Sequence, residues 1–159
     1  MPKLTPADLQ TYLHRQAIEG EILKLDVPTP TVETAAQAVG VREEQIIKSI
    51  LFLVNKQPLL VIASGTARVE QRRIAQVYGL GRKQVKLASP AEVLDHTGYA
   101  VGALPPFGHS QVLATLIDRR VLEQDEVYAG GGAENALLRL AAADILRITR
   151  GKVVDLAGG

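Results

Sequence analysis

Two features of the sequence could place polar groups where chemistry needs them. Lys48 lies between the apolar residues 46–47 and the apolar run 50–54, where an ammonium group without an anionic or carbonyl partner is costly to bury. Residues 102–109 include two glycines and two prolines, which exclude regular secondary structure and can hold backbone N–H groups toward a ligand, as in an oxyanion hole. Lys48 is therefore a candidate cation for a phosphate or an ester carbonyl, and the loop is a candidate for stabilising an oxyanion.

Both features also have purely structural explanations, which the sequence leaves open. The long stem of Lys48 could carry its charge to solvent at the end of a strand. The loop of residues 102–109 could be a rigid turn without a ligand. His109, at the end of this loop, could be a polar group at the mouth of a pocket or a structural histidine.

Positive charge is concentrated between residues 68 and 86. The net charge of the whole chain is only +1, whereas this stretch has Glu70 as its single acid. Its basic residues are Arg68, Arg72, Arg73, Arg82, Lys83 and Lys86. Such a local excess suits a phosphate backbone, although it could also be a solvated helix face. RNA contact through Arg68, Arg72, Arg73, Arg82 and Lys83 is one hypothesis that the pattern supports.

Several kinds of chemistry find no support in the residue types or their spacing. The chain has no cysteine, and its three histidines, His14, His96 and His109, lack the spacing of metal ligands. No serine lies in a nucleophile elbow, and the three glycines of 130–132 lack the helix and spacing of a phosphate-binding fingerprint. We therefore expect no metal and no cofactor.

Helix caps and apolar periodicity predict the elements that position these candidates. Thr5, Thr31 and Ser89 are each typical of a helix N-cap, and Gly40 of a C-terminal stop. Helices are expected at residues 6–19, 32–39, 43–47, 68–78, 90–98 and 142–148, with Lys48 ending the third. Strands are expected at residues 23–27, 50–54, 59–63, 85–87, 112–117, 127–129 and 137–140, the second and third forming a hairpin. This alternation indicates a mixed α/β or α+β fold.

Length and composition set the remaining expectations. A chain of 159 residues is the size of one domain, and 47% hydrophobic with 22% charged residues is typical of a globular protein. No apolar run approaches the ~18 residues of a membrane span, and Met1 to Leu4 open no apolar signal region. We therefore expect a cytoplasmic protein that does not interact with a membrane.

The order and spacing of several segments resemble the YbaK/ProX family of aminoacyl-tRNA deacylases. This superfamily includes the editing domain inserted in bacterial prolyl-tRNA synthetases. The resemblance spans most of the chain, and its motifs are more specific together than singly. They are residues 31–36 with Gly40 and Val41, residues 45–49, 87–93, 97–102 and 106–108, Gly131 with Gly132, and residues 140–144.

The resemblance implies one editing domain over residues 1–159, a mixed α/β fold with a curved, barrel-like central sheet. It implies hydrolysis of the ester that joins an amino acid to the terminal adenosine of tRNA, without a metal. In the family, a lysine at the position of Lys48 holds the terminal region of the substrate. The glycine matching Gly102, in a G-x-x-x-P loop that ends here at Pro106, presents backbone to the aminoacyl carbonyl.

Further substrate contacts follow from the same resemblance. Ser49 occupies a position that touches the substrate, and Gly131 with Gly132 matches a second glycine-rich pocket wall. We therefore expect Lys48, the loop and these glycines to converge on one cleft. Several relatives carry aromatic residues where this chain has residues 23–25 and 31–32, so the amino acid specificity stays open.

The expected activity is trans-editing of a mischarged tRNA of the proline type, or a related one, that carries a small amino acid. Mischarged tRNA is the expected partner, with an aminoacyl-tRNA synthetase as a second. One alternative is a non-catalytic module of the same fold that binds RNA or a synthetase. Another is an esterase for small molecules, which would gain nothing from the body of the tRNA.

Overall fold

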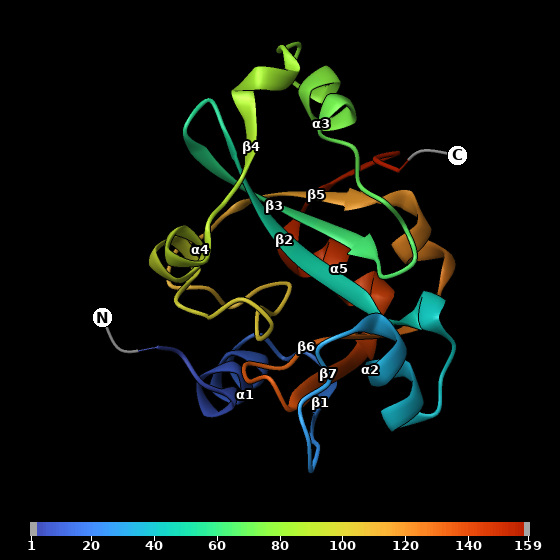
Figure 1. The fold of residues 1–159 in the computed structure, drawn as a ribbon. Coiled ribbons are helices and arrows are strands. Elements are labelled where there is room, and N and C mark those ends of the chain that lie inside the picture. Colours follow the sequence, from blue (N-terminus) through green and yellow to red (C-terminus); the bar gives the residue numbers. More distant parts are fainter. Residues whose placement is uncertain (1–2, 158–159) are drawn as a thin grey trace.

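Two β-sheets form the centre of this computed structural model, which describes residues 3–157 (Figure 1). The larger sheet has the order β4-β2-β3-β5-β8 and the smaller one β1-β7-β6. The larger sheet consists of β2 (Ile47–Val54), β3 (Gln57–Ser64), β4 (Val85–Leu87), β5 (Ala114–Asp118) and β8 (Lys152–Val154). The smaller sheet consists of β1 (Gly20–Lys24), β6 (Glu126–Gly130) and β7 (Ala136–Ala141).

The fold is of the mixed α/β class, as predicted, and the larger sheet contains both parallel and antiparallel strands. β2 pairs antiparallel with β3 and β4, whereas β3 with β5 and β5 with β8 are parallel pairs. The smaller sheet is antiparallel throughout. In residues 3–157 neither sheet is closed into a barrel, and the expected single curved sheet is two sheets. A parallel bridge between Ile46 and Tyr128 connects them.

Five α-helices in the described residues surround the sheets, and their N-termini are largely where the caps predict. They are α1 (Pro6–Arg15), α2 (Val32–Val39), α3 (Gln71–Val77), α4 (Pro90–Thr97) and α5 (Ala142–Thr149). Thr5, Thr31 and Ser89 each accept a hydrogen bond from the backbone N–H three residues later, which satisfies a free donor of the first turn. Short 3₁₀ turns lie at Glu43–Gln45, Arg82–Gln84 and Arg119–Glu123.

The structure differs from the predicted elements at several points. Lys48 does not end a helix but is the second residue of β2, and α3 begins at Gln71 instead of residue 68. β8 and the turn Arg119–Glu123 were not predicted. The hairpin between β2 and β3 is tighter than expected, because Asn55 and Lys56 both have positive φ (51° and 69°), as in a two-residue turn of type I′.

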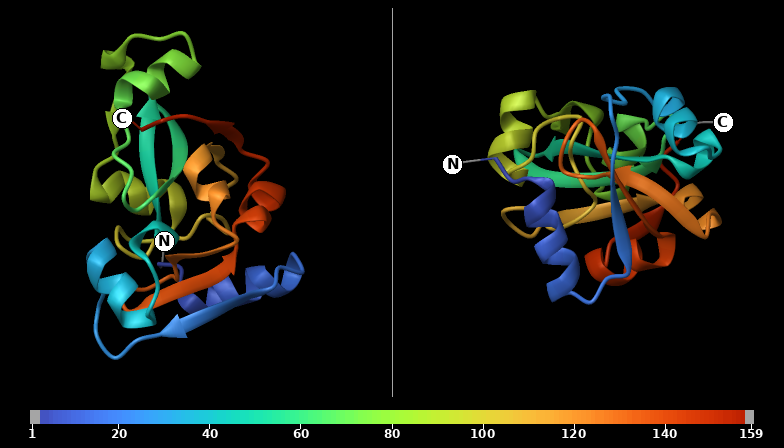
Figure 2. Two further views of the ribbon diagram at one scale, coloured as in Figure 1. Left: turned by 90° about the vertical axis from the view of Figure 1, so that its right-hand side faces the viewer. Right: turned by 90° about the horizontal axis from the view of Figure 1, so that it is seen from below.

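Apolar side chains fill both faces of the β2–β3 hairpin. Leu51, Leu60 and Ile62 belong to the larger core, which includes residues of α1, α4 and α5. Phe52 and Val61, on the opposite face, join a second core with Ile74 of α3. The left view of Figure 2 agrees with Figure 1 in placing α3 at the end of the molecule away from the three-stranded sheet. Within residues 3–157, none of the helices combines the length and apolar character needed to span a bilayer.

Candidate functional site

One edge of β2 is only partly covered by a neighbouring strand. β4 pairs with Phe52, Leu53 and Val54, and the Ala88 N–H donates a hydrogen bond to the Leu51 carbonyl (3.0 Å). On this edge no described strand pairs with residues 48–50. Two hollows flank this open edge, and six of the twelve predicted site residues line one or the other.

The first hollow, which we call the basic cleft, has a volume of about 780 Å³. Its walls come from β2, from residues 68–72, which include the first residues of α3, and from residues 82 and 87. The lining residues are Lys48, Ile50, Phe52, Arg68, Val69, Glu70, Gln71, Arg72, Arg82 and Leu87. Four cationic side chains therefore face one carboxylate, and the cleft is positively charged.

Most of these cations are free to bind an anion. Lys48, Arg68 and Arg82 form no ion pair with the residues that the structure describes. Arg72 is 64% exposed and lies 3.5 Å from Glu70, a distance at which an exposed ion pair contributes little. Lys83 lines an adjoining hollow with Arg82, which extends the positive surface.

Arg73 is the exception among the predicted tRNA-binding residues. Its Nε donates a 2.8 Å hydrogen bond to Glu70, and its guanidinium lies 3.5 Å from Asp155. The hydrogen bond from Arg73 is the main reason that the pKa of Glu70 lies below its ordinary value. Arg73 does not line the basic cleft and is paired with Glu70 and Asp155, because residues 72 and 73 point in different directions from the helix.

The second hollow, the apolar pocket, has a volume of about 280 Å³. It is lined by Ser49, Ile50, Leu51, Leu87, Ala88, Pro90, Val93, Val101, Gly102 and Leu104. The side chain of Ser49 is the only polar one in this lining. Its Oγ is buried and has no hydrogen-bond partner among the described residues, which is costly unless a ligand or water supplies one.

Gly102 opens one wall of the apolar pocket for two separate reasons. Its φ of +89° is a conformation that L side chains rarely adopt. A Cβ atom at this position would meet no described atom within 4 Å, so the space beside the backbone is open. A ligand in the pocket can therefore approach the backbone of Gly102 without a side chain between them.

The expected single cleft is thus two adjoining hollows. Lys48 and Ser49 are neighbours on a strand, and neighbouring side chains of a strand point to opposite faces. Lys48 consequently lines the basic cleft, whereas Ser49 lines the apolar pocket with Gly102. Ile50 and Leu87 line both hollows, so the two sites meet across the open edge of β2.

The glycines predicted to form a second pocket wall pack against the loop of residues 102–109 and do not face either hollow. Gly131 and Gly132 line neither the basic cleft nor the apolar pocket. The Gly132 N–H donates a 2.9 Å hydrogen bond to the Ala103 carbonyl, and a Cβ on Gly132 would lie 2.9 Å from the Pro6 nitrogen. On Gly131 it would lie 2.6 Å from the carbonyl carbon of Ala136. The structure thus shows these glycines allowing close backbone packing that supports the loop.

His109 and Pro106 line a third hollow on another side of the same loop, with Tyr12 and Phe107. The His109 Nε2 lies 2.8 Å from the Pro105 carbonyl oxygen, so this nitrogen is assigned as the donor. Burial lowers the pKa of His109 and favours the neutral ring. The Phe107 and Tyr12 rings stack at 5.6 Å. These contacts brace the loop and place neither His109 nor Pro106 in the apolar pocket.

Sequence reasoning missed the apolar rim where the two hollows meet. Leu87 is 61% exposed and Val101 55% exposed, although both are large apolar residues. Val85 and Leu87 are two residues apart in β4, so strand alternation predicts the same exposure for both side chains. Val85 is nevertheless buried and Leu87 is exposed, and no sequence signal distinguishes them. Exposed apolar side chains beside a cavity are typical of a ligand-binding rim.

The arrangement limits the chemistry that the pocket itself can perform. None of its ten lining residues is a histidine, aspartate or glutamate, so no lining side chain is a general base. Among residues 3–157 no group of three or more His, Cys, Asp or Glu side chains is placed to hold a metal ion. The groups available are backbone, one hydroxyl and a neighbouring cationic surface. These can orient an already reactive bond and stabilise developing negative charge.

Comparisons with known proteins agree on one family. The family model described as the aminoacyl-tRNA editing domain matches residues 26–148. The uncharacterized protein YwhH of Bacillus subtilis (strain 168) is 26% identical, with 91% of each chain covered. The proline–tRNA ligase of Stenotrophomonas maltophilia (strain R551-3) is 28% identical over 121 residues, which are 73% of this chain and 21% of the ligase. A crystal structure described as that of a candidate trans-editing enzyme for prolyl tRNA synthetase matches with a TM-score of 0.90, at 33% identity and 97% coverage of each chain.

Proposed function

The chain belongs to the family of aminoacyl-tRNA editing domains, and on this premise we propose that it hydrolyses the ester bond of mischarged tRNA. The observation that carries the proposal is that the basic cleft and the apolar pocket adjoin along the edge of β2. The end of a charged tRNA has the same two parts side by side, a chain of phosphates and a small aminoacyl group. Phosphates suit the cleft of Lys48, Arg68, Arg72 and Arg82, and an aminoacyl group suits the pocket.

The proposed reaction needs orientation more than strong acid or base groups. The oxygen of a water molecule bonds to the aminoacyl carbonyl carbon, and the bond from that carbon to the ribose oxygen breaks. The products are the free amino acid and a tRNA with a free hydroxyl. Backbone at Gly102 stabilises the oxyanion of the intermediate, while Lys48 holds the terminal part of the RNA. Protons move through water or through groups of the substrate itself.

The identity of the relatives supports a more specific proposal for the RNA. One solved relative is described as a candidate trans-editing enzyme for prolyl tRNA synthetase, and sequence matches include proline–tRNA ligases. We propose a tRNA of the proline type, carrying a small amino acid, as the substrate. The synthetase that charges this tRNA is the second proposed partner.

A deacylation assay with a panel of mischarged tRNAs tests the proposal. We expect the protein to release at least one small amino acid faster from proline-type tRNA than from another tRNA carrying the same amino acid. Ser49→Leu, which fills the apolar pocket, should abolish the release, whereas Ser110→Leu, an equal change at an exposed position, should not. Release no faster than spontaneous hydrolysis with every charged tRNA would refute deacylation. Equal rates with and without the tRNA body would indicate a small-molecule esterase.

A further inference from the structure

We propose that Asp118 is a positioning residue for tRNA, because it fixes a short C-terminal strap that in turn holds one wall of the basic cleft. The strap consists of residues 155–157. The inference rests on the proposed function, since it assumes that the cleft binds RNA. Asp118 and the strap themselves line neither the basic cleft nor the apolar pocket.

Asp118, the last residue of β5, is fully buried and is saturated with hydrogen bonds. Its Oδ2 accepts a 2.7 Å bond from the Leu156 N–H. Its Oδ1 accepts bonds from the backbone N–H of Arg120 (3.1 Å) and from the Arg120 guanidinium (3.2 Å). A buried carboxylate with this set of donors is strongly tied to them, because an unpaired charge there would be costly. Asp118 therefore fixes Leu156 against the core.

The strap then holds the segment that forms the cleft wall. The Glu70 N–H donates a 2.9 Å hydrogen bond to the Leu156 carbonyl, and Val69 forms an antiparallel bridge with Ala157. Leu156 is itself buried in the core that contains Ile74 of α3. Val69 and Glu70 both line the basic cleft. The wall is thus joined to the Asp118 carboxylate through the backbone N–H and carbonyl groups of Leu156.

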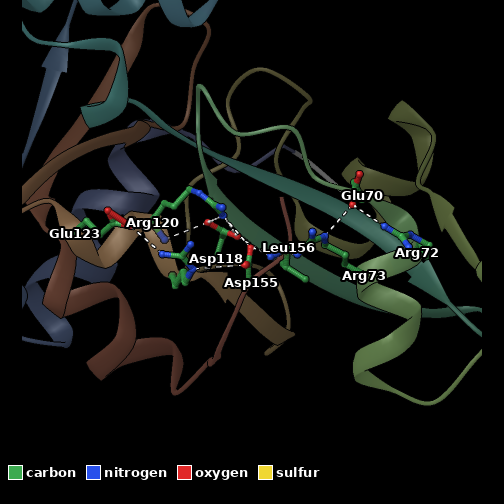
Figure 3. Close-up of polar contacts among 9 residues, drawn as sticks. Glu70, Arg72, Arg73, Asp118, Arg120, Glu123, Asp155 and Leu156 are labelled. Carbon is green, nitrogen blue, oxygen red and sulfur yellow. Dashed lines mark hydrogen bonds and ion pairs between the residues drawn. The ribbon is translucent and has the colours of Figure 1, made fainter. Parts of the chain in front are cut away.

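Side chains form a second layer of this connection (Figure 3). Asp155 accepts a 3.0 Å hydrogen bond from Arg120 and lies 3.5 Å from Arg73, which also bonds Glu70. The hydrogen bond from Arg120 is the main reason that the pKa of Asp155 is lowered, so this carboxylate stays ionised near neutral pH. The chain of charges runs from Asp118 to the start of α3.

Besides the strap, the wall is held by packing of Val69 and of Ile74 in α3 on the second core, and few polar contacts orient its start. Glu70 is the N-cap of α3, yet its side chain makes no capping hydrogen bond within the described structure, and α3 has only seven residues. Residues 68–70 belong to no named strand. Loosening the strap should therefore move Arg68 and Arg72 out of register with the phosphates, while the apolar pocket stays intact.

The proposal predicts that removing a carboxylate weakens RNA binding, whereas the change in net charge alone predicts tighter binding. Removing a carboxylate makes the protein more positive, and on charge alone RNA should bind more tightly. If Asp118 and Asp155 position the wall, removing either charge should weaken RNA binding instead. Asp144→Asn is the matched control, because it removes the same charge from an ion pair with Arg147 on α5.

The test compares Asp118→Asn, Asp155→Asn and Asp144→Asn with the unchanged protein. We expect Asp118→Asn to raise KM for charged tRNA by roughly three- to thirtyfold with kcat within about twofold, and Asp155→Asn to do so more weakly. Both should leave hydrolysis of an aminoacyl ester of adenosine unchanged. Both should also speed hydrogen exchange of the Glu70 amide. Asp144→Asn should leave KM unchanged or slightly lower and the exchange unchanged.

A KM that stays the same or falls in both Asp118→Asn and Asp155→Asn would overturn the proposal, as would an unchanged exchange rate at Glu70. If Asp118→Asn does not fold, the exposed Asp155→Asn decides with the same measurements. If the unchanged protein releases no amino acid from any tRNA, the proposed function fails. Affinity for uncharged tRNA and the Glu70 exchange rate then decide the positioning role separately.

Discussion

Replacing Lys48 by alanine separates binding of the RNA from chemistry at the ester. Lys48 lies in the basic cleft with Arg68 and Arg72, and on the face of β2 opposite to Ser49. We therefore expect its ammonium to contact a phosphate near the end of the tRNA instead of the reacting carbonyl. The variant should fold normally, because no described carboxylate loses an ion-pair partner when Lys48 is removed.

The size of the effect follows from the charges that line the cleft. Four cations and one carboxylate give a net charge of +3 (4 − 1), and Lys48→Ala lowers it to +2. A hydrogen bond to a charged group is worth about 1.5–3 kcal/mol, which is roughly ten- to 150-fold in affinity. The slope of log affinity against log salt should become shallower by about 0.7, the value for one phosphate of a single strand. The free energy of unfolding should change by less than about 0.5 kcal/mol.

The assay measures single-turnover deacylation of charged tRNA and of an aminoacyl ester of adenosine, which has no phosphate. Lys48→Ala should slow the first at limiting protein concentration and leave the second almost unchanged. Lys48→Arg should retain most of the activity, and Lys152→Ala, the same change at the exposed start of β8, should have no effect. Equal losses on both substrates would refute the phosphate role and would place the ammonium at the carbonyl.

Four further changes test other parts of the site. Gly102→Ala should fold at a cost of about 1–2 kcal/mol for its positive φ, but should slow the single-turnover reaction because the new Cβ occupies the open space beside the Gly102 backbone. Gly130→Ala should lower the free energy of unfolding by about 1–3 kcal/mol, measured in denaturant, because its Cβ would collide with the backbone carbonyl of Leu104 in the loop. The pKa of His109 in the folded protein is below its ordinary value of 6.5. The neutral His109 ring therefore contributes fully to the free energy of unfolding above pH 6.5, and this contribution is lost as the pH falls from 6.5 toward the pKa of the folded protein. Unfolding of His109→Gln in denaturant should therefore depend less on pH in this range. Arg72→Glu should weaken tRNA binding and flatten its salt dependence, whereas Arg147→Glu, the same reversal on α5, should do neither.

Much of the fold could be predicted because its signals are local. The helix starts at Thr5, Thr31 and Ser89 depend on hydrogen bonds within one turn, which the sequence shows directly. β8 could not be found in this way, because its three residues become a strand only by pairing with β5, which is distant in sequence. The division into two sheets depends on the same kind of long-range pairing.

The sequence was sufficient to identify many residues of the candidate site, but not to predict which of them share a hollow. Arg68, Arg72 and Arg82 were identified from a local excess of charge, and they share one cleft. Arg73 could not be separated from Arg72, because its partner Asp155 is brought to it only by the fold. The division between Lys48 and Ser49 follows from strand alternation, but it could not be seen while Lys48 was assigned to the end of a helix.

The alternation of β2 makes its two faces separately adjustable. Changes at Ser49 or Leu51 alter the volume and polarity of the apolar pocket, and changes at Lys48 or Phe52 alter the opposite surface. A lineage could therefore acquire a new amino acid preference by substitutions at odd-numbered positions while the even-numbered ones keep the same RNA. Ile50, which lines both hollows, is where this independence should fail, so substitutions there should change both preferences together.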